Sequence, residues 1–95
     1  TDRSVGGYST YYTPKTPYDK RFAAILQKEL MTTANVPDRG IYDSGLYVNR
    51  KSTMPSALVE CLFMTNAREE QLLLSDSFLD KIAEAIARGI EQFEK

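Results

Sequence analysis

The stretch Ala57-Leu58-Val59-Glu60-Cys61-Leu62-Phe63-Met64 is an apolar run that contains a single charged residue. A continuous apolar run of this length is typical of a strand covered on both faces, as in the centre of an α/β sheet. Because side chains alternate along a strand, Glu60 shares one face with Leu58 and Leu62, whereas Val59, Cys61 and Phe63 point to the other. We therefore expect a buried strand with one carboxylate at the base of an apolar wall.

Three segments around this strand carry helix signals. Thr16-Pro17-Tyr18-Asp19 combines a hydroxyl cap, a proline at the first helical position and a carboxylate at the third, which predicts a helix to about Thr33. Asn66 begins a second capping pattern, and Ser75 or Ser77 caps a last helix. The apolar stripe of that last helix consists of Phe78, Leu79, Ile82, Ile86, Ile90 and Phe93.

The remaining segments predict further strands and a loop. Tyr8 to Thr13 alternate with period two in residues that favour strands, and residues 46–48 form a second short strand. Residues 34–45 contain Pro37, Gly40 and Gly45, which indicates a loop with at most a short strand near Ile41. The mixed order predicts an α/β fold: part of a mixed twisted sheet of about three strands flanked by about three helices, in one domain over residues 1–95.

Composition excludes several functions within this chain. It has 95 residues, no histidine, one cysteine and a net charge of −1. Without imidazole, Ser-His-Asp and Cys-His catalysis cannot operate here, and a zinc site built from the chain's own residues is not expected. A dedicated nucleic-acid binder would show a basic excess, and the longest apolar stretch is too short to insert into a membrane. We read the opening Thr1-Asp2-Arg3 as the start of a piece of something longer.

The apolar segment around Glu60 allows two interpretations of its carboxylate, one structural and one functional. Burying a carboxylate costs several kcal/mol unless a partner compensates, which favours a salt bridge to Arg50 or Lys51, or a register that turns Glu60 to solvent at a sheet edge. The functional reading is general acid/base catalysis, because an apolar surround raises the pKa of a carboxyl group towards neutrality. The run by itself leaves both readings open.

The motifs around Glu60 occur in a familiar order. Residues 46–50 (LYVNR), 54–60 (MPSALVE) and 63–66 (FMTN) resemble the second half of the zinc-dependent N-acetylmuramoyl-L-alanine amidases of the amidase-3 family, whose pattern there is similar to LYVLR…MPAVLVELGFLSN. Gly7 to Tyr12 are similar to the family's strand after its last zinc histidine, and Arg39-Gly40-Ile41 to its RGV loop. The resemblance covers nearly the whole chain and implies that residues 1–95 are the C-terminal portion of one amidase catalytic domain.

The resemblance also implies a chemistry. Family members hold a zinc ion with two histidines and a glutamate, and they cleave the amide bond between N-acetylmuramic acid and L-Ala of peptidoglycan. Glu60 matches the strand glutamate that acts as general acid/base, and the zinc ligands would precede this chain. The implied partners are peptidoglycan and the missing N-terminal half of the domain, and the implied location is extracellular, at the cell wall, or in a phage-borne lysin. The isolated chain is predicted to be inactive.

Two further residues are candidates beside Glu60. Leu62 stands where the family usually has glycine, so its side chain would narrow the cleft or mark a variant of altered activity. Arg50 follows the LYV strand and would either hold a stem-peptide carboxylate or lie solvated in a loop. The alternative to an enzyme is a non-catalytic relative that binds peptidoglycan or a partner protein.

Overall fold

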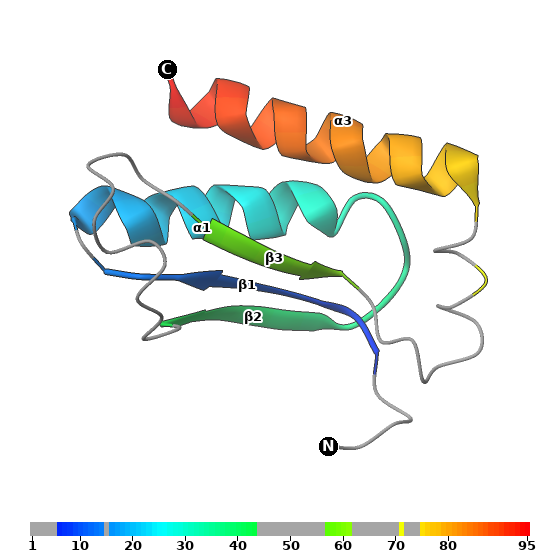
Figure 1. Ribbon diagram of the computed structural model, residues 1–95, viewed down its shortest axis with the longest axis horizontal. Helices are drawn as coiled ribbons and strands as arrows, with labels where there is room; N and C mark the ends of the chain where they lie inside the picture. Colours follow the sequence, from blue (N-terminus) through cyan, green and yellow to red (C-terminus); the bar gives the residue numbers. More distant parts are fainter. Residues whose placement is uncertain (1–5, 15, 44–56, 62–70, 72–74) are drawn as a thin grey trace.

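The computed structural model describes residues 6–14, 16–43, 57–61, 71 and 75–95. Its elements are β1 (Tyr8–Tyr12), α1 (Pro17–Leu30), β2 (Asp38–Asp43), β3 (Ala57–Cys61) and α3 (Asp76–Phe93). The strands form one mixed sheet in the order β2-β1-β3, in which β1 is parallel to β2 and antiparallel to β3. The two helices lie on the same face of this sheet, α1 against the strands and α3 along α1 (Figure 1). The predicted α/β class is confirmed.

Both described helices begin where the sequence predicts. Thr16 accepts a hydrogen bond from the backbone N–H of Tyr18, Asp19 accepts one from the backbone N–H of Thr16, and Pro17 occupies the first turn. Ser75 caps α3 by accepting from the backbone N–H of Phe78. These side chains satisfy backbone donors that have no partner within the helix.

The ends of the elements differ from the prediction at two points. Helix α1 ends at Leu30 and not at Thr33, because Thr32 and Thr33 form turns that bond back to Glu29 and Leu30. Strand β2 spans six residues, although the prediction allowed only a short strand near Ile41. The predicted strand at 46–48 and most of the helix predicted after Asn66 lie outside the described residues.

The hydrophobic core lies between the sheet and the two helices. Tyr8, Leu30, Val36, Phe78 and Ala85 are buried there, and Val59, Ile82 and Ile86 pack against them. Only some residues of the apolar stripe predicted for the last helix therefore pack into this core. Leu79 and Ile90 of the same stripe are 45% and 42% exposed.

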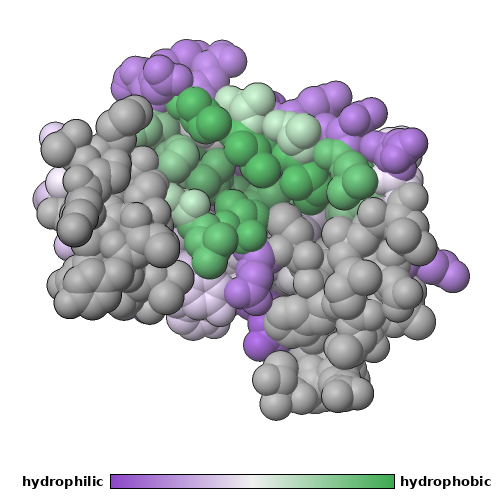
Figure 2. Space-filling model, in the orientation of Figure 1, coloured by the Kyte–Doolittle hydropathy of each residue, from purple (hydrophilic) through white to green (hydrophobic). Residues whose placement is uncertain are grey.

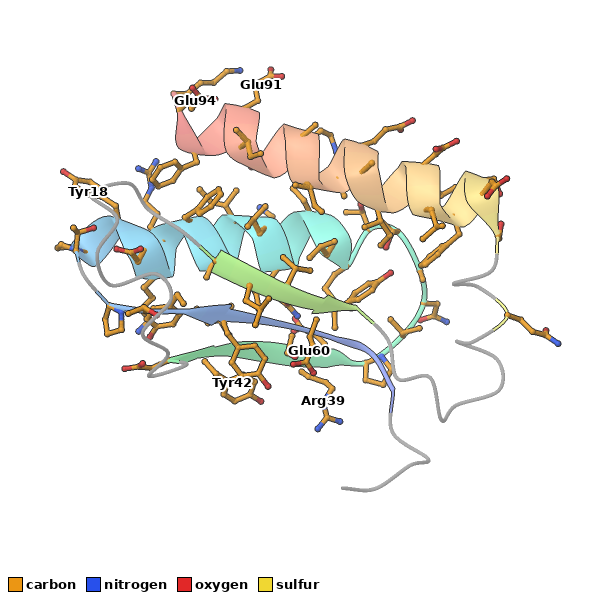
Figure 3. The ribbon with its side chains drawn as sticks, viewed as in Figure 1. Tyr18, Arg39, Tyr42, Glu60, Glu91 and Glu94 are labelled. Carbon is orange, nitrogen blue, oxygen red and sulfur yellow. The ribbon has the colours of Figure 1, made fainter. Side chains whose placement is uncertain are left out.

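The expectation that residues 57–61 are covered on both faces is wrong for the structure described. Val59 packs against the core, but Leu58 is 47% exposed and Glu60 is exposed. The predicted alternation of faces is correct. The described helices cover only the face that carries Val59, and no described helix covers the face that carries Glu60, which we call the open face (Figure 3).

A charged contact joins the two helices. The Arg88 Nε donates to Oε1 of Glu29 at 2.8 Å, and the Gln92 amide donates to Oε2 of Glu29. These hydrogen bonds, from Arg88 first and then from Gln92, lower the pKa of Glu29 below its ordinary value of 4.5. A carboxyl group whose pKa is lowered in the folded state stabilises the fold above its unfolded pKa and loses that contribution as the pH falls through its folded pKa.

We therefore expect Glu29→Gln to be less stable than the parent at pH 7, with a difference that shrinks as the pH falls below about 4.5. Urea unfolding midpoints between pH 7 and pH 3 measure this difference. The matched control is Glu91→Gln, because Glu91 and Lys95 form an ion pair at 4.0 Å between two largely exposed side chains. A difference between Glu29→Gln and the parent that stays constant over this pH range would contradict the assignment.

Candidate functional site

The face of the sheet opposite the helices carries the residue that the sequence singles out. Glu60 is the penultimate residue of β3, and its Cα pairs with Ser9 of β1. Its side chain projects away from both helices, on the same side as Arg39 and Tyr42 (Figure 3). No ion pair between described residues uses Glu60. Of the alternatives for this carboxylate, the structure shows the solvent-facing register at a sheet edge; Arg50 and Lys51 lie outside the described residues.

A β-bulge in β2 determines which side chains share the face of Glu60. Tyr8 pairs with Asp38 and Thr10 pairs with Ile41, so Ser9 alone lies opposite both Arg39 and Gly40. The extra residue shifts the alternation of β2, which turns Ile41 towards the helix face and Tyr42 to the open face beside Tyr11. The Tyr11 and Tyr42 rings lie 5.6 Å apart.

Polar side chains of α1, β1 and β2 hold this bulge in place. Gly40 has a φ of +86°, a conformation that favours glycine, and its N–H donates to Oδ1 of Asp38 at 2.9 Å. The Gln27 amide of α1 donates to the same Oδ1 at 2.7 Å and to the Tyr8 carbonyl at 2.9 Å. Thr10 in turn donates to the Gln27 Oε1 at 2.9 Å. The bulge is therefore anchored from the helix side of the sheet.

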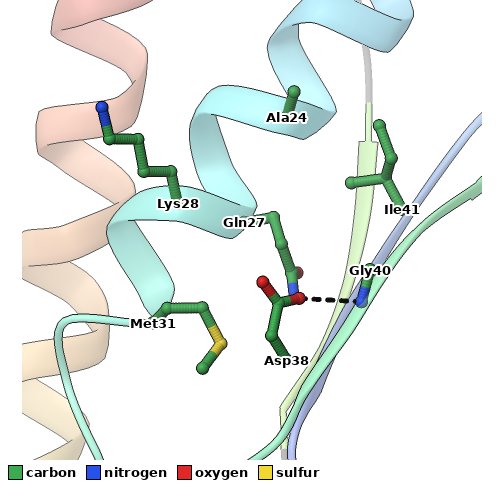
Figure 4. Close-up of a pocket in the computed structure, with 7 residues that line it drawn as sticks. All are labelled: Ala24, Gln27, Lys28, Met31, Asp38, Gly40 and Ile41. Atoms are coloured by element: carbon green, nitrogen blue, oxygen red, sulfur yellow. Dashed lines mark hydrogen bonds between the residues drawn. The ribbon is translucent and has the colours of Figure 1, made fainter.

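A pocket of about 360 Å³ lies over this network, on the helix side. Its lining comes from α1 and β2 and consists of Ala24, Gln27, Lys28, Met31, Asp38, Gly40 and Ile41 (Figure 4). Glu60 projects from the opposite face of the sheet, so the pocket and the predicted acid/base residue are separate features. Gln27, which is buried, and Asp38, which is exposed, line the pocket and are already hydrogen-bonded to the bulge.

Apolar side chains gather on the surface over β3 and α3 (Figure 2). Leu58 of β3 and Leu79 and Ile90 of α3 are large hydrophobic residues that are exposed on these two elements. Strand β3 has one neighbour, β1, in the described sheet and therefore forms an edge. Free strand edges pair with other strands, and exposed apolar surfaces are typical of places where another segment or protein packs.

The described residues do not form a metal site. Within these ranges no three His, Cys, Asp or Glu side chains come together in a way that could hold a metal ion. The residues present thus do not fit the zinc set of two histidines and a glutamate. Likewise, none of the helices described here has the length and apolar character needed to cross a membrane.

The sequence-predicted site residues are only partly placed. Glu60 lies on the open face, whereas Arg50 and Leu62 lie outside the described residues. Sequence reasoning missed the bulge and the position of Arg39 opposite Ser9. An isolated glycine inside a strand pattern is a known bulge signal, and Gly40 after Asp38-Arg39 could have indicated it.

Comparison with known proteins identifies the family. Residues 1–92 match the family model Amidase_3, described as N-acetylmuramoyl-L-alanine amidase. The chain is 39% identical over 88 residues to the N-acetylmuramoyl-L-alanine amidase LytC of Bacillus subtilis, covering 90% of this chain and 18% of LytC. It is 34% identical over 94 residues to the uncharacterized protein YqiI of the same organism, covering 95% of this chain and 45% of YqiI.

Solved structures agree with this match. An N-acetylmuramoyl-L-alanine amidase from Clostridium difficile 630 aligns over 98% of this chain and 50% of its own length, with a TM-score of 0.87 and 32% identity. The catalytic domain of the amidase CwlV from Bacillus (Paenibacillus) polymyxa var. colistinus aligns over 97% of this chain and 50% of its own, with a TM-score of 0.84 and 33% identity. The sequence match and the shared fold together show that this chain, which spans about half the length of these solved relatives, belongs to the Amidase_3 family of N-acetylmuramoyl-L-alanine amidases.

Proposed function

We propose that this chain is the part of a peptidoglycan amidase domain that supplies the general acid/base, Glu60. The observation that carries the proposal is the family match over residues 1–92, and the resemblance of the segment around Glu60 to the family's strand motif supports the role of this residue. The reaction is hydrolysis of the amide bond between the lactyl group of N-acetylmuramic acid and L-Ala of the stem peptide. A relative named as a cell-wall amidase and another named as a phage endolysin support action outside the cell, at the wall.

Glu60 is suited to moving protons in this reaction. Its carboxylate projects from the open face, where it can accept a proton from an attacking water and pass a proton to the leaving amine of L-Ala. Transfer of both protons by one carboxyl group returns Glu60 to its starting state.

The zinc ion that the family resemblance implies would require ligands outside these 95 residues. The chain contains no histidine, and its described residues hold no suitable cluster. Zinc, when bound in the complete domain, supplies water activation and carbonyl polarisation. We therefore propose that the isolated chain is inactive and that Arg50 and Leu62 contribute to substrate binding only within the complete domain.

The remaining half of the domain is the partner that we propose for the apolar surface over β3 and α3. The chain spans 50% of the solved amidase from C. difficile, so a comparable length of chain completes the fold. The free edge of β3 can pair with a further strand, and Leu58, Leu79 and Ile90 would then be covered. The edge at β2 is a poorer candidate, because Asp38, Tyr42 and Asp43 on that strand are exposed.

Incubation of the complete domain with purified peptidoglycan tests the proposed function. We expect new α-amino groups on L-Ala and release of stem peptides of unchanged composition, measured by end-group labelling and mass spectrometry. The 95-residue chain alone should release none. If the complete domain binds peptidoglycan and releases no stem peptide, the non-catalytic alternative replaces the enzyme.

A further inference from the structure

Arg39 lies at the same end of the sheet as Glu60 and on the same face. Glu60 pairs with Ser9, and Ser9 lies opposite the bulge that contains Arg39, so the three residues form one row across β3, β1 and β2. Both side chains project away from the helices (Figure 3). The row therefore places a cation two strands away from the proposed acid/base.

The charges of the described strands make Arg39 distinctive. Strands β1, β2 and β3 contain Asp38, Arg39, Asp43 and Glu60, so Arg39 is the one cation among the strand residues that the structure describes. Asp38 and Asp43 pair with Tyr8 and Tyr12, which alternate with Ser9 and Tyr11 and so belong to the helix face. On the open face, the described strands thus present one carboxylate and one guanidinium.

The pairing of Tyr8 with Asp38 sets the face of Arg39, and the bulge that follows brings Tyr42 to the same face. A regular β2 would continue its alternation through Gly40, but the bulge allows Arg39 and Tyr42 to share the open face although they are three residues apart. Gln27, which is 5% exposed, holds this geometry through its hydrogen bond to Asp38. Bulges of this kind re-aim side chains next to active sites.

We propose that Arg39 binds a carboxylate of the substrate, namely the α-carboxylate of the D-glutamate that follows L-Ala in the stem peptide. This inference rests on the proposed function and adds a specificity residue to it. Guanidinium groups bind carboxylates through paired, charge-assisted hydrogen bonds, which fix both position and orientation. Walls in which this carboxylate is amidated to isoglutamine would then be poorer substrates.

The spacing of the two groups fits this substrate. Neighbouring strands lie about 4.8 Å apart, so the backbones of Glu60 and Arg39 are separated by roughly 10 Å across β1. An extended peptide advances about 3.5 Å per residue, so the glutamate carboxylate lies roughly 7 Å beyond the scissile nitrogen. With Glu60 at the scissile amide, the flexible Arg39 side chain reaches this carboxylate.

The test compares two substrates in the complete domain. N-acetylmuramoyl-L-alanyl-D-glutamate carries the free carboxylate, and N-acetylmuramoyl-L-alanyl-D-isoglutamine carries an amide in its place. We expect Arg39→Gln to lower kcat/KM for the first substrate about 10- to 100-fold, mainly through KM, and for the second substrate less than about twofold. Arg39→Lys should retain part of the preference, and Arg21→Gln on α1 is the matched control.

A binding measurement separates this inference from the proposed function. The dipeptides L-Ala-D-Glu and L-Ala-D-isoglutamine are titrated into the complete domain and followed by NMR. If the parent prefers the acid and Arg39→Gln removes this preference, the inference stands even when neither muropeptide is cleaved, in which case the proposed function fails.

Two results would overturn the inference. The first is a loss of equal size on both muropeptides, which would make Arg39 a structural residue or a positioning residue for Glu60. The second is equal binding of the two dipeptides by the parent.

Discussion

Glu60→Gln is expected to lower kcat for release of stem peptide from muropeptide by about 10²- to 10⁴-fold in the complete amidase domain. Glutamine has the shape of glutamate and cannot accept or deliver a proton at physiological pH, so the substitution removes the proton transfers and little else. Steady-state hydrolysis measures the effect. A change confined to KM would show that Glu60 contributes to binding and not to the chemical step.

The expected stability of this variant makes the test specific. Glu60 is exposed, and none of the ion pairs between described residues includes it, so the urea midpoint should change little. The zinc content of the purified domain should also be that of the parent. Glu91→Gln removes a carboxylate from the exposed face of α3 and should retain full activity. Near-normal turnover of Glu60→Gln would refute the assigned role.

The substitution Gly7→Ala is expected to produce the largest loss of stability, about 3–5 kcal/mol. Gly7 has a φ of +108°, and an added Cβ would lie 2.0 Å from the carbonyl oxygen of Pro37. That carbonyl accepts a hydrogen bond from the N–H of Tyr8 at 3.1 Å, and Tyr8 is fully buried in the core. The new methyl group must therefore separate the starts of β1 and β2 or break their contact. Urea unfolding of the complete domain measures the loss.

Gly40→Ala is the matched control for this prediction. Gly40 also has a positive φ, of +86°, but the nearest atom to its added Cβ is the Tyr42 Oη at 3.9 Å. Only the backbone conformation is penalised there, which costs about 1–2 kcal/mol. Losses of equal size for the two variants would show that close approach to Pro37 is unimportant, and would leave the backbone conformation as the whole effect.

Local signals in the sequence predicted the elements well. The Thr16 cap, Pro17 and Asp19 predicted the start of α1, and the alternation of residues 8–13 predicted β1 with an end one residue too late. These features depend on hydrogen bonds and packing between residues close in sequence, so a short segment contains the information. The end of α1 was placed three residues too late, because the Thr32 and Thr33 hydroxyl groups bond back to the helix carbonyls and favour turns.

The sequence by itself determined the two helix starts, the strand character of residues 57–61 and the separation of Glu60 from Val59 onto opposite faces. Only the tertiary structure decided which of those faces is open, which residue lies opposite Glu60, and that Arg39 and Tyr42 share its face. The physical reason is the separation along the chain of the residues that make each feature. Caps and alternation are local, whereas the bulge at Gly40 depends on Gln27 of a helix and Ser9 of another strand, which the fold alone brings together.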